Sequence, residues 1–264
     1  ASDVYKRQVY MAYNQRSLFV TGVWTTVQLA LAGTAIAFVL ALLMVFLRIQ
    51  EPDKRNNDFV KIIKIVANKF ARFYIFVIRG TPMMVQSLIF YYAIFNLFKR
   101  TGMSVTEINR VWSLFISGLV TVSLNSTAYL AEVLRGGILA VDAGQMEAAR
   151  SLGMTHWQAM RRVVFPQAIK NSLPAIGNEF IINIKDSSVL CVLGVSDLMF
   201  MTRSVAGIYY KGTECYLIAA TVYLFLTYLS SLLLKTITGR MTAPDNTKRR
   251  QGNQTVDLGL PSSN

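Results

Sequence analysis

A few charged and polar side chains lie inside otherwise apolar sequence, and they are the first candidates for chemistry. On a helix over residues 171–200, Glu179, Asn183 and Asp186 share one face, because they are spaced at i, i+4 and i+7. Lys185 points elsewhere if that helix is unbroken. Two interpretations stay open: an acidic face that lines a polar path, or a buried network of hydrogen bonds and ion pairs.

A second polar group lies in the apolar stretch 111–131 and just beyond it. Asn125, Ser126 and Tyr129 are candidates to line the same path, and Glu132 follows directly. Small polar residues in apolar helices also form hydrogen bonds between helices. This second group therefore has the same two interpretations.

Residue types that catalysis or cofactor binding would need are scarce. The chain has one histidine, His156, and its two cysteines, Cys191 and Cys215, are far apart in the sequence. No cluster of zinc-type ligands is predicted from this pattern. No G-x4-G-K-[ST] segment occurs, so a phosphate-binding loop of that type is not expected. We expect no enzymatic activity, metal or cofactor on this chain.

Composition places these candidates in a membrane. The chain of 264 residues is 53% hydrophobic and 16% charged, whereas soluble domains average about 25% charged residues. Disorder is excluded for the chain as a whole, because disordered chains are poor in apolar residues. The net charge of +13 suits a nucleic-acid-binding protein or a membrane protein with basic cytoplasmic loops.

Uncharged runs predict where the chain crosses the membrane. A spanning helix needs about 20 mainly apolar residues, and helices satisfy their own backbone groups where no water is present. We predict an all-α membrane protein with about five transmembrane helices, the fifth of them buried among the others. The predicted spans cover residues 17–47, 80–98, 111–131, 171–200 and 215–234.

The distribution of basic residues predicts the orientation. Eighteen of the 27 Lys and Arg residues fall in segments 48–79 and 135–170 and in the chain from residue 235 onward. Cytoplasmic loops carry such an excess, so the N-terminus is predicted outside and the C-terminus inside. The charge is spread over three segments without stacking aromatics, and no nucleic-acid partner is expected.

The first inner segment contains an amphipathic helix. Lys61, Lys64, Asn68 and Arg72 share one face and apolar residues share the other. This pattern predicts a helix that lies along the membrane surface. The alternative is a basic segment that leads into the next span.

The second inner segment predicts a helix, a tight turn and another helix. Residues 144–152 form the first helix and Gly153 ends it. Thr155 and Gln158 fit a capping box for the second helix, which Pro166 is expected to stop. A compact projection of this kind indicates a docking site for another protein.

This projection resembles the EAA loop of ABC importer permeases (E-A-A-x3-G-x9-I-x-L-P). The matching residues are Glu147-Ala148-Ala149, Gly153 and Val163-Val164-Phe165-Pro166, with Val in place of Ile and Phe in place of Leu. Further segments, in order over about residues 17–238, resemble the polar amino-acid branch of that family. They are Gly22-x2-Thr25-Thr26-Val27-Gln28, Arg79-Gly80-Thr81-Pro82 with Gln86, Ala128-Tyr129 with Glu132, Arg135-Gly136-Gly137-Ile138, Pro166-Gln167-Ala168 and Lys185-Asp186-Ser187-Ser188.

The resemblance implies a type I ABC importer transmembrane domain in a bacterial plasma membrane. Its expected partners are a second permease subunit, identical or similar, an ATPase dimer that binds ATP and Mg, an external amino-acid-binding protein and membrane lipid. It implies coupling to the ATPase through Glu147, Ala148, Ala149, Gly153 and Pro166. Lys185, Asp186 and Ser187 are further candidates for the substrate path, although the shared motif argues for a structural or gating role more than for substrate choice. Arg79, Thr81, Pro82 and Gln86 are expected at the cytoplasmic edge in a structural or gating role, with Pro82 in the first turn of a helix and Arg79 reaching the interface.

Three segments are expected on this basis. Residues 1–16 form an outer tail, residues 17–238 the permease domain, and residues 239–264 a polar cytoplasmic tail that lacks the composition of a packed structure. Whether residues 1–10 are native is open, and we assign them no function. The alternative function is a secondary transporter or channel that works without an ATPase.

Overall fold

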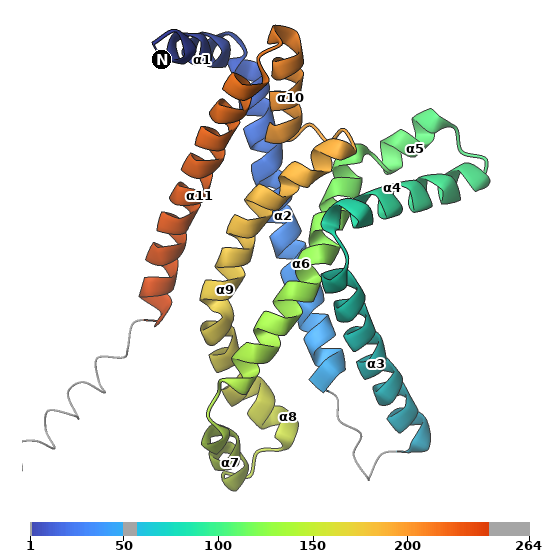
Figure 1. The fold of residues 1–264 in the computed structure, drawn as a ribbon. Helices are drawn as coiled ribbons and strands as arrows, with labels where there is room; N and C mark the ends of the chain where they lie inside the picture. Colours follow the sequence, from blue (N-terminus) through green and yellow to red (C-terminus); the bar gives the residue numbers. More distant parts are fainter. Residues whose placement is uncertain (1, 50–56, 243–264) are drawn as a thin grey trace, which may run out of the picture.

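The computed structural model describes residues 2–49 and 57–242, and all regular elements in these ranges are helices (Figure 1). The α-helices are α1 (Ser2–Asn14), α2 (Arg16–Ile49), α3 (Asp58–Gly80), α4 (Met83–Arg100), α5 (Val105–Val111), α6 (Leu114–Leu139), α7 (Ala143–Ser151), α8 (His156–Ala159), α9 (Phe165–Asp186), α10 (Leu198–Tyr209) and α11 (Gly212–Thr242). A π-helical segment, Met160–Val164, joins α8 to α9, and a 3-10 segment, Ser187–Val192, follows α9. The all-α prediction is confirmed.

Three helices in the described ranges are each long and apolar enough to cross a membrane. They are α2, α6 and α11, and they contain most of the predicted spans 17–47, 111–131 and 215–234. The helices α3 and α4 pass the same test only as a pair and are bent by 114° at the break between them, the geometry of a broken span or of a re-entrant loop. The span predicted over residues 80–98 thus covers α4, the second helix of this bent pair.

Successive long helices run in opposite directions (Figure 1). The helices α2, α6 and α11 run from the end of the bundle that holds α1 and α10 toward the end that holds α7 and α8, and α3 and α9 return. These alternating directions are consistent with five crossings if α9 counts as one crossing and the α3–α4 pair as another. We call the α7 end the inner end and the α1 end the outer end.

The centre of the bundle is the contact between α2 and α6 (Figure 1). Alanines on both helices are buried there, including Ala37 and Ala41 on α2 and Ala128 and Ala131 on α6. Small side chains let helix backbones approach closely, which is how helices pack where lipid removes the hydrophobic driving force. The same packing places the polar residues of both helices inside the bundle.

The bend between α3 and α4 follows from local sequence. Pro82 is the N-cap of α4, and Thr81 before it is extended, with φ −124° and ψ 145°, because a residue that precedes proline is kept out of the helical region. The Gln86 side-chain amide donates hydrogen bonds to the backbone oxygens of Ile78 (2.7 Å) and Thr81 (2.9 Å). These bonds satisfy carbonyls that the end of α3 leaves free.

The orientation of α3 differs from the predicted surface helix. It lies antiparallel to the inner half of α2 and packs against α6, with Ala71 and Ile75 buried (Figure 1). The Asn68 amide reaches the Arg48 backbone oxygen at 2.6 Å, so the polar face of α3 turns toward the end of α2. Arg79 is therefore carried along the bundle to the bend, and does not lie at its inner edge as expected.

Two predictions about α9 were wrong. Pro166 does not stop a helix, because it lies in the first turn of α9 and the π-helical segment Met160–Val164 continues directly into that turn. The chain therefore stays helical on both sides of the proline. The predicted span 171–200 is not one helix, since α9 ends at Asp186 and the chain passes through the 3-10 segment and a turn before α10. That turn includes Gly194 at φ 90°.

Both predicted tails are helical where they are described. Residues 2–14 form α1, whose Asn14 donates a hydrogen bond of 2.7 Å to the hydroxyl of Tyr209 on α10. At the other end α11 extends through Thr242, three residues past the expected start of the tail. The remainder of that tail, residues 243–264, lies outside the described residues.

Candidate functional site

The loop at the inner end is built from two capped helices. The Asp142 side chain caps α7 by accepting from the Gly144 backbone N–H at 2.6 Å. Gly153 ends the turn after α7 with φ 81°, a conformation that glycine adopts without the cost of a β-carbon. In the capping box of α8, the Thr155 hydroxyl accepts from Gln158 and the Gln158 side chain accepts from Thr155. The predicted turn and capping box are both present.

The loop exposes small side chains and a carboxylate that forms no ion pair within the described ranges. Glu147 and Ala148 are exposed and Ala149 is buried, so α7 packs on its base through one face and presents the other. Leu152, beside the turn, is 81% exposed. Glu147 forms no ion pair with any residue in the described ranges. An exposed leucine beside small residues and a free carboxylate suits a groove on another protein.

The loop is attached to α2 by a ring contact and to α6 and α9 by its own chain. The Trp157 ring meets Phe46 of α2 edge to face, with ring centroids 5.8 Å apart. The chain also continues from α8 through the π-helical segment directly into α9. Such π segments are rare and occur frequently at functional sites. Pro166, predicted as part of the coupling loop, therefore joins the loop to α9.

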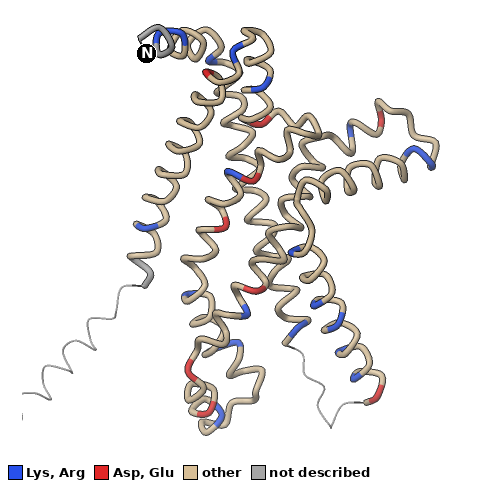
Figure 2. Tube along the Cα trace, in the orientation of Figure 1, with Lys and Arg blue, Asp and Glu red and all other residues tan. Residues whose placement is uncertain are grey.

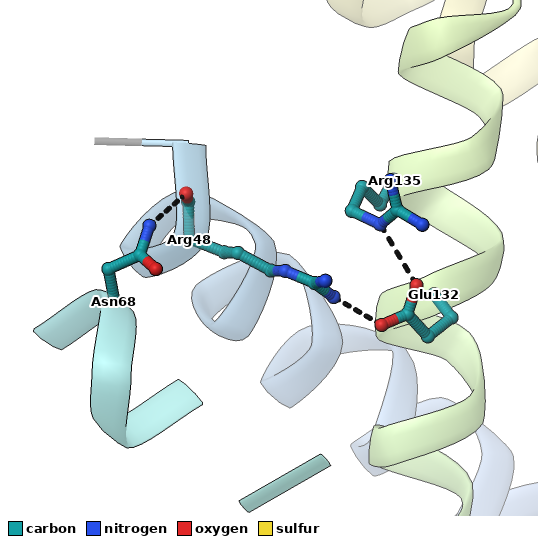
Figure 3. Close-up of polar contacts among 4 residues, drawn as sticks. All are labelled: Arg48, Asn68, Glu132 and Arg135. Atoms are coloured by element: carbon teal, nitrogen blue, oxygen red, sulfur yellow. Dashed lines mark hydrogen bonds and ion pairs between the residues drawn. The ribbon is translucent and has the colours of Figure 1, made fainter. Parts of the chain in front are cut away.

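An ion-pair cluster links α2 to α6 above the loop (Figure 3). Glu132 accepts from Arg48 through one carboxylate oxygen and from Arg135, at 2.9 Å, through the other. Arg48 thus holds the inner end of α2 against α6, and its backbone oxygen accepts the Asn68 amide of α3. Glu132 is the acidic residue of α6 and lies seven residues before the end of that helix at Leu139. The predicted path residue Glu132 thus joins α6 to α2, and Arg48 extends the connection to α3.

Two further arginines border a cavity beside this cluster. The cavity of about 470 Å³ lies between α2, α3 and α6 and is lined by Arg48, Arg72, Ile75, Phe76, Arg79, Gly80 and Glu132. The Arg79 guanidinium lies over the Tyr129 ring, 5.3 Å from its centroid. Arg79, expected to be structural, and Tyr129, expected on the path, therefore lie together.

A line of hydrogen bonds crosses the middle of the bundle. The Asn183 amide donates to Thr34 of α2 at 2.8 Å, and its side-chain oxygen accepts from Ser126 of α6 at 2.9 Å. The Asn125 amide donates to the Gln86 side-chain oxygen at 2.9 Å. These side chains are buried within this single chain, which favours the interpretation as a network for Asn183, Ser126 and Asn125.

The remaining predicted residues on α9 are divided between interior and surface. Glu179 is buried, whereas Lys185 and Asp186 are exposed at the end of the helix. Ser187 is buried and donates to the Ile184 backbone oxygen at 3.0 Å. The structure therefore does not bring Glu179, Asn183 and Asp186 together as one exposed acidic face.

Arg48, Arg72 and Thr34 belong to these sites but were not among the predicted site residues. Arg48 was counted only as a loop charge, Arg72 only as part of the polar face of an amphipathic helix, and Thr34 was one uncharged residue of a long apolar run. A signal existed for Arg48, since it lies within the last turn of a helix that must meet other helices. No group of three His, Cys, Asp or Glu side chains in the described ranges is arranged to hold a metal ion.

Comparison with known proteins agrees with this arrangement. Residues 62–243 match the family described as binding-protein-dependent transport system inner membrane component. The chain belongs to this family. It is thus an inner membrane component of an ABC importer, whose ATPase is carried by a separate subunit and whose substrate arrives on a binding protein.

Individual relatives cover most of the chain. The nopaline transport system permease protein NocM of Agrobacterium fabrum is 31% identical over 80% of this chain and 82% of its own length. The glutamine transport system permease protein GlnP of Escherichia coli is 34% identical over 67% of this chain and 76% of its own length. A chain in a crystal structure of an amino acid ABC transporter with histidines is 38% identical, with a TM-score of 0.71 over 86% of this chain and 96% of that one. The importer permease therefore has the type I fold that the EAA loop indicated.

Proposed function

We propose that this permease carries amino acids inward, that it forms the translocation path with a second permease subunit, and that α7 couples it to the ATPase. The family membership supports the ATP-driven class over a secondary transporter or channel. The relatives that act on nopaline and glutamine and the amino acid transporter of known structure support the substrate class.

One observation carries the coupling assignment. The α7 loop projects from the inner end with Glu147, Ala148 and Leu152 exposed, and it is fixed to both α6 and α9 (Figure 1). ATP-driven movement of a partner that holds α7 would therefore displace two membrane helices together. Pro166 and the π-helical segment would transmit this displacement to α9.

The same proposal includes the orientation. The inner end holds α7, and most basic residues of α3 and of the loop between α6 and α9 lie toward it (Figure 2). Placing that end in the cytoplasm agrees with the excess of Lys and Arg there. The N-terminus is then outside. In a variant with both native cysteines replaced, Leu152→Cys should react with a membrane-impermeant maleimide only after the cytoplasmic side is opened; reaction in intact cells would refute the orientation.

Gly153→Val tests the coupling assignment. A β-branched side chain cannot adopt φ 81° without strain of about 1–2 kcal/mol or more, and no atom within 4 Å would be displaced by the added β-carbon. The turn is expected to change while the bundle stays folded. We expect normal membrane insertion but at least tenfold slower amino-acid uptake and weaker copurification of the ATPase.

Gly102→Val is the matched control. Gly102 also has a positive φ, 87°, with no atom within 4 Å of an added β-carbon, but it lies at the outer end between α4 and α5. It should leave copurification of the ATPase unchanged. Normal uptake and ATPase binding by a membrane-resident Gly153→Val protein would refute the coupling assignment.

A further inference from the structure

The cavity beside the Glu132 cluster carries more positive charge than its acidic residue can balance. Arg48, Arg72 and Arg79 line it together with Glu132. Glu132 is already paired with Arg48 and with Arg135. Neither Arg72 nor Arg79 forms an ion pair with any residue in the described part of the chain. The cavity therefore offers two guanidinium groups to an anionic group from outside the chain.

The position of this cavity along the bundle makes such charges costly without a function. Asn68 is level with Arg48, because its amide bonds the Arg48 backbone oxygen. Arg79 lies eleven residues farther along α3, which is about 16 Å at the rise of an α-helix. The cavity thus reaches from the inner end of α2 well into the bundle. Ionisable residues at such depth face water-filled cavities and mark the routes of substrates or ions.

The cavity has the volume of a small-ligand site and is open on one side, where Arg72, Phe76 and Arg79 are exposed. Its volume of about 470 Å³ lies within the usual range of small-ligand sites. Ile75 and Phe76 supply apolar walls, and the Tyr129 ring holds the Arg79 guanidinium from one side. A guanidinium stacked in this way keeps its N–H fork free, and that fork matches the two oxygens of a carboxylate.

We propose that Arg79 and Arg72 bind the α-carboxylate of the transported amino acid in this cavity, which is a site on the inner half of the path. The proposal rests on the amino-acid import proposed above and adds the chemical group that the path recognises. The Glu132 cluster fixes the cavity walls by joining α2, α3 and α6. An anionic phospholipid headgroup is the competing occupant, and the test below distinguishes it.

The experiment measures binding to the purified permease and ATPase complex in lipid nanodiscs without binding protein. The probes are radiolabelled L-glutamine, L-glutamate, L-arginine and L-histidine, each in competition with its own carboxamide, in which the α-carboxylate is replaced. The variants are Arg79→Gln and Arg72→Gln, with Arg79→Lys as the conservative substitution. Lys69→Gln is the matched control, because Lys69 is an exposed cation of α3 that does not line the cavity.

The expected result is a loss of affinity that depends on the carboxylate. Hydrogen bonds to charged groups contribute more to binding than neutral ones. Arg79→Gln should therefore weaken amino-acid binding by about 10- to 100-fold. It should weaken carboxamide binding much less, so the preference for the acid over the amide should nearly disappear. Arg79→Lys should restore part of that preference, and Lys69→Gln should match the wild-type complex.

Several results would overturn the site. The first is undetectable amino-acid binding by a wild-type complex that does transport amino acids. The second is an Arg79→Gln complex that prefers the acid over the carboxamide as strongly as the wild type does. The third is a loss of bound phosphatidylglycerol in both arginine variants while amino-acid binding stays unchanged. The last result would assign the cavity to a lipid headgroup. Failure of the amino-acid import itself is seen separately, as absence of uptake by the wild-type complex in vesicles supplied with ATP and binding protein.

Discussion

Asn183→Leu tests whether the hydrogen bonds in the middle of the bundle stabilise the fold or serve the path. Asn183 joins three helices, because its amide donates to Thr34 of α2 and its oxygen accepts from Ser126 of α6. Leucine has the same number and branching of side-chain heavy atoms but forms neither bond. The substitution therefore removes two hydrogen bonds while it keeps the branched shape of the side chain.

The magnitude follows from those two bonds. Hydrogen bonds between membrane helices average about 0.6 kcal/mol each and reach about 1.7 kcal/mol. The freed hydroxyls of Thr34 and Ser126 can bond the backbone oxygen four residues earlier on their own helices, so the loss stays at about 1–3 kcal/mol. For a chain of this size we expect the unfolding temperature of the purified complex to fall by roughly 2–10 °C.

The assay is thermal unfolding of the detergent-solubilised complex, followed by its retention in size-exclusion chromatography. Asn178→Leu is the matched control, since Asn178 is exposed on the same helix and forms no hydrogen bond that spans the bundle. The triple variant Thr34→Val, Ser126→Ala and Asn183→Leu replaces the whole group with apolar side chains. It should recover part of the lost stability, because the three replaced positions no longer carry an unpaired polar group, although the buried Glu179 loses its contact with the Ser126 hydroxyl.

Two results would refute this reasoning. Equal shifts for Asn183→Leu and Asn178→Leu would show that the three-helix connection contributes nothing specific. A triple variant that is stable but takes up no amino acid would assign Asn183 to the path, since stability would have been separated from transport. A stable triple variant that transports normally would establish the network interpretation.

Two other substitutions test contacts on α6. Gly137→Val should reduce the amount of folded complex in the membrane. An added β-carbon would lie 2.0 Å from the Ser172 hydroxyl and 2.7 Å from the Ala168 backbone oxygen, and overpacking of this kind costs about 1–3 kcal/mol of stability. Gly136→Val is its control, with no atom within 4 Å of the added β-carbon, and equal folded amounts for the two variants would contradict the close contact. Glu132→Gln should lower the unfolding temperature by a few degrees, since each partly exposed ion pair contributes about 1 kcal/mol or less. In a double-mutant cycle with Arg48→Gln the effects should be less than additive, and strict additivity would exclude a shared interaction.

Local signals in the sequence were sufficient for several parts of the site. The capping box of Thr155 and Gln158 and the turn at Gly153 depend on residues three or fewer apart, and both are present. Long uncharged runs predicted α2, α6 and α11, because length and hydropathy alone decide whether a helix can cross a membrane. These features need no knowledge of what packs against them.

Other parts depend on packing that a single sequence does not reveal. Asn183 and Thr34 are 149 residues apart, so nothing in the local sequence pairs them. The basic face of α3 was read as facing water at the membrane surface, yet Asn68 turns toward the end of α2. Pro166 was expected to end a helix. Its place in the first turn of α9 depends on the π-helical segment before it, which the local sequence does not reveal.

The connection between the α7 loop and the arginine cavity follows from the order of elements along the chain. The last turns of α6 carry Glu132 at the cavity and Gly137 against α9, and only three residues separate the end of α6 from α7. At the other end of the loop, the Gln167 amide of α9 donates to the Gln145 side chain of α7 at 3.4 Å. Because α6 and α9 touch at Gly137, we expect a displacement of α7 to move both helices together. We infer that such a displacement alters the separation of α6 from α3, and hence the distance between Glu132 and Arg79 across the cavity. If that inference holds, substitutions at Gly153 change amino-acid binding to the isolated complex as well as its coupling to ATP.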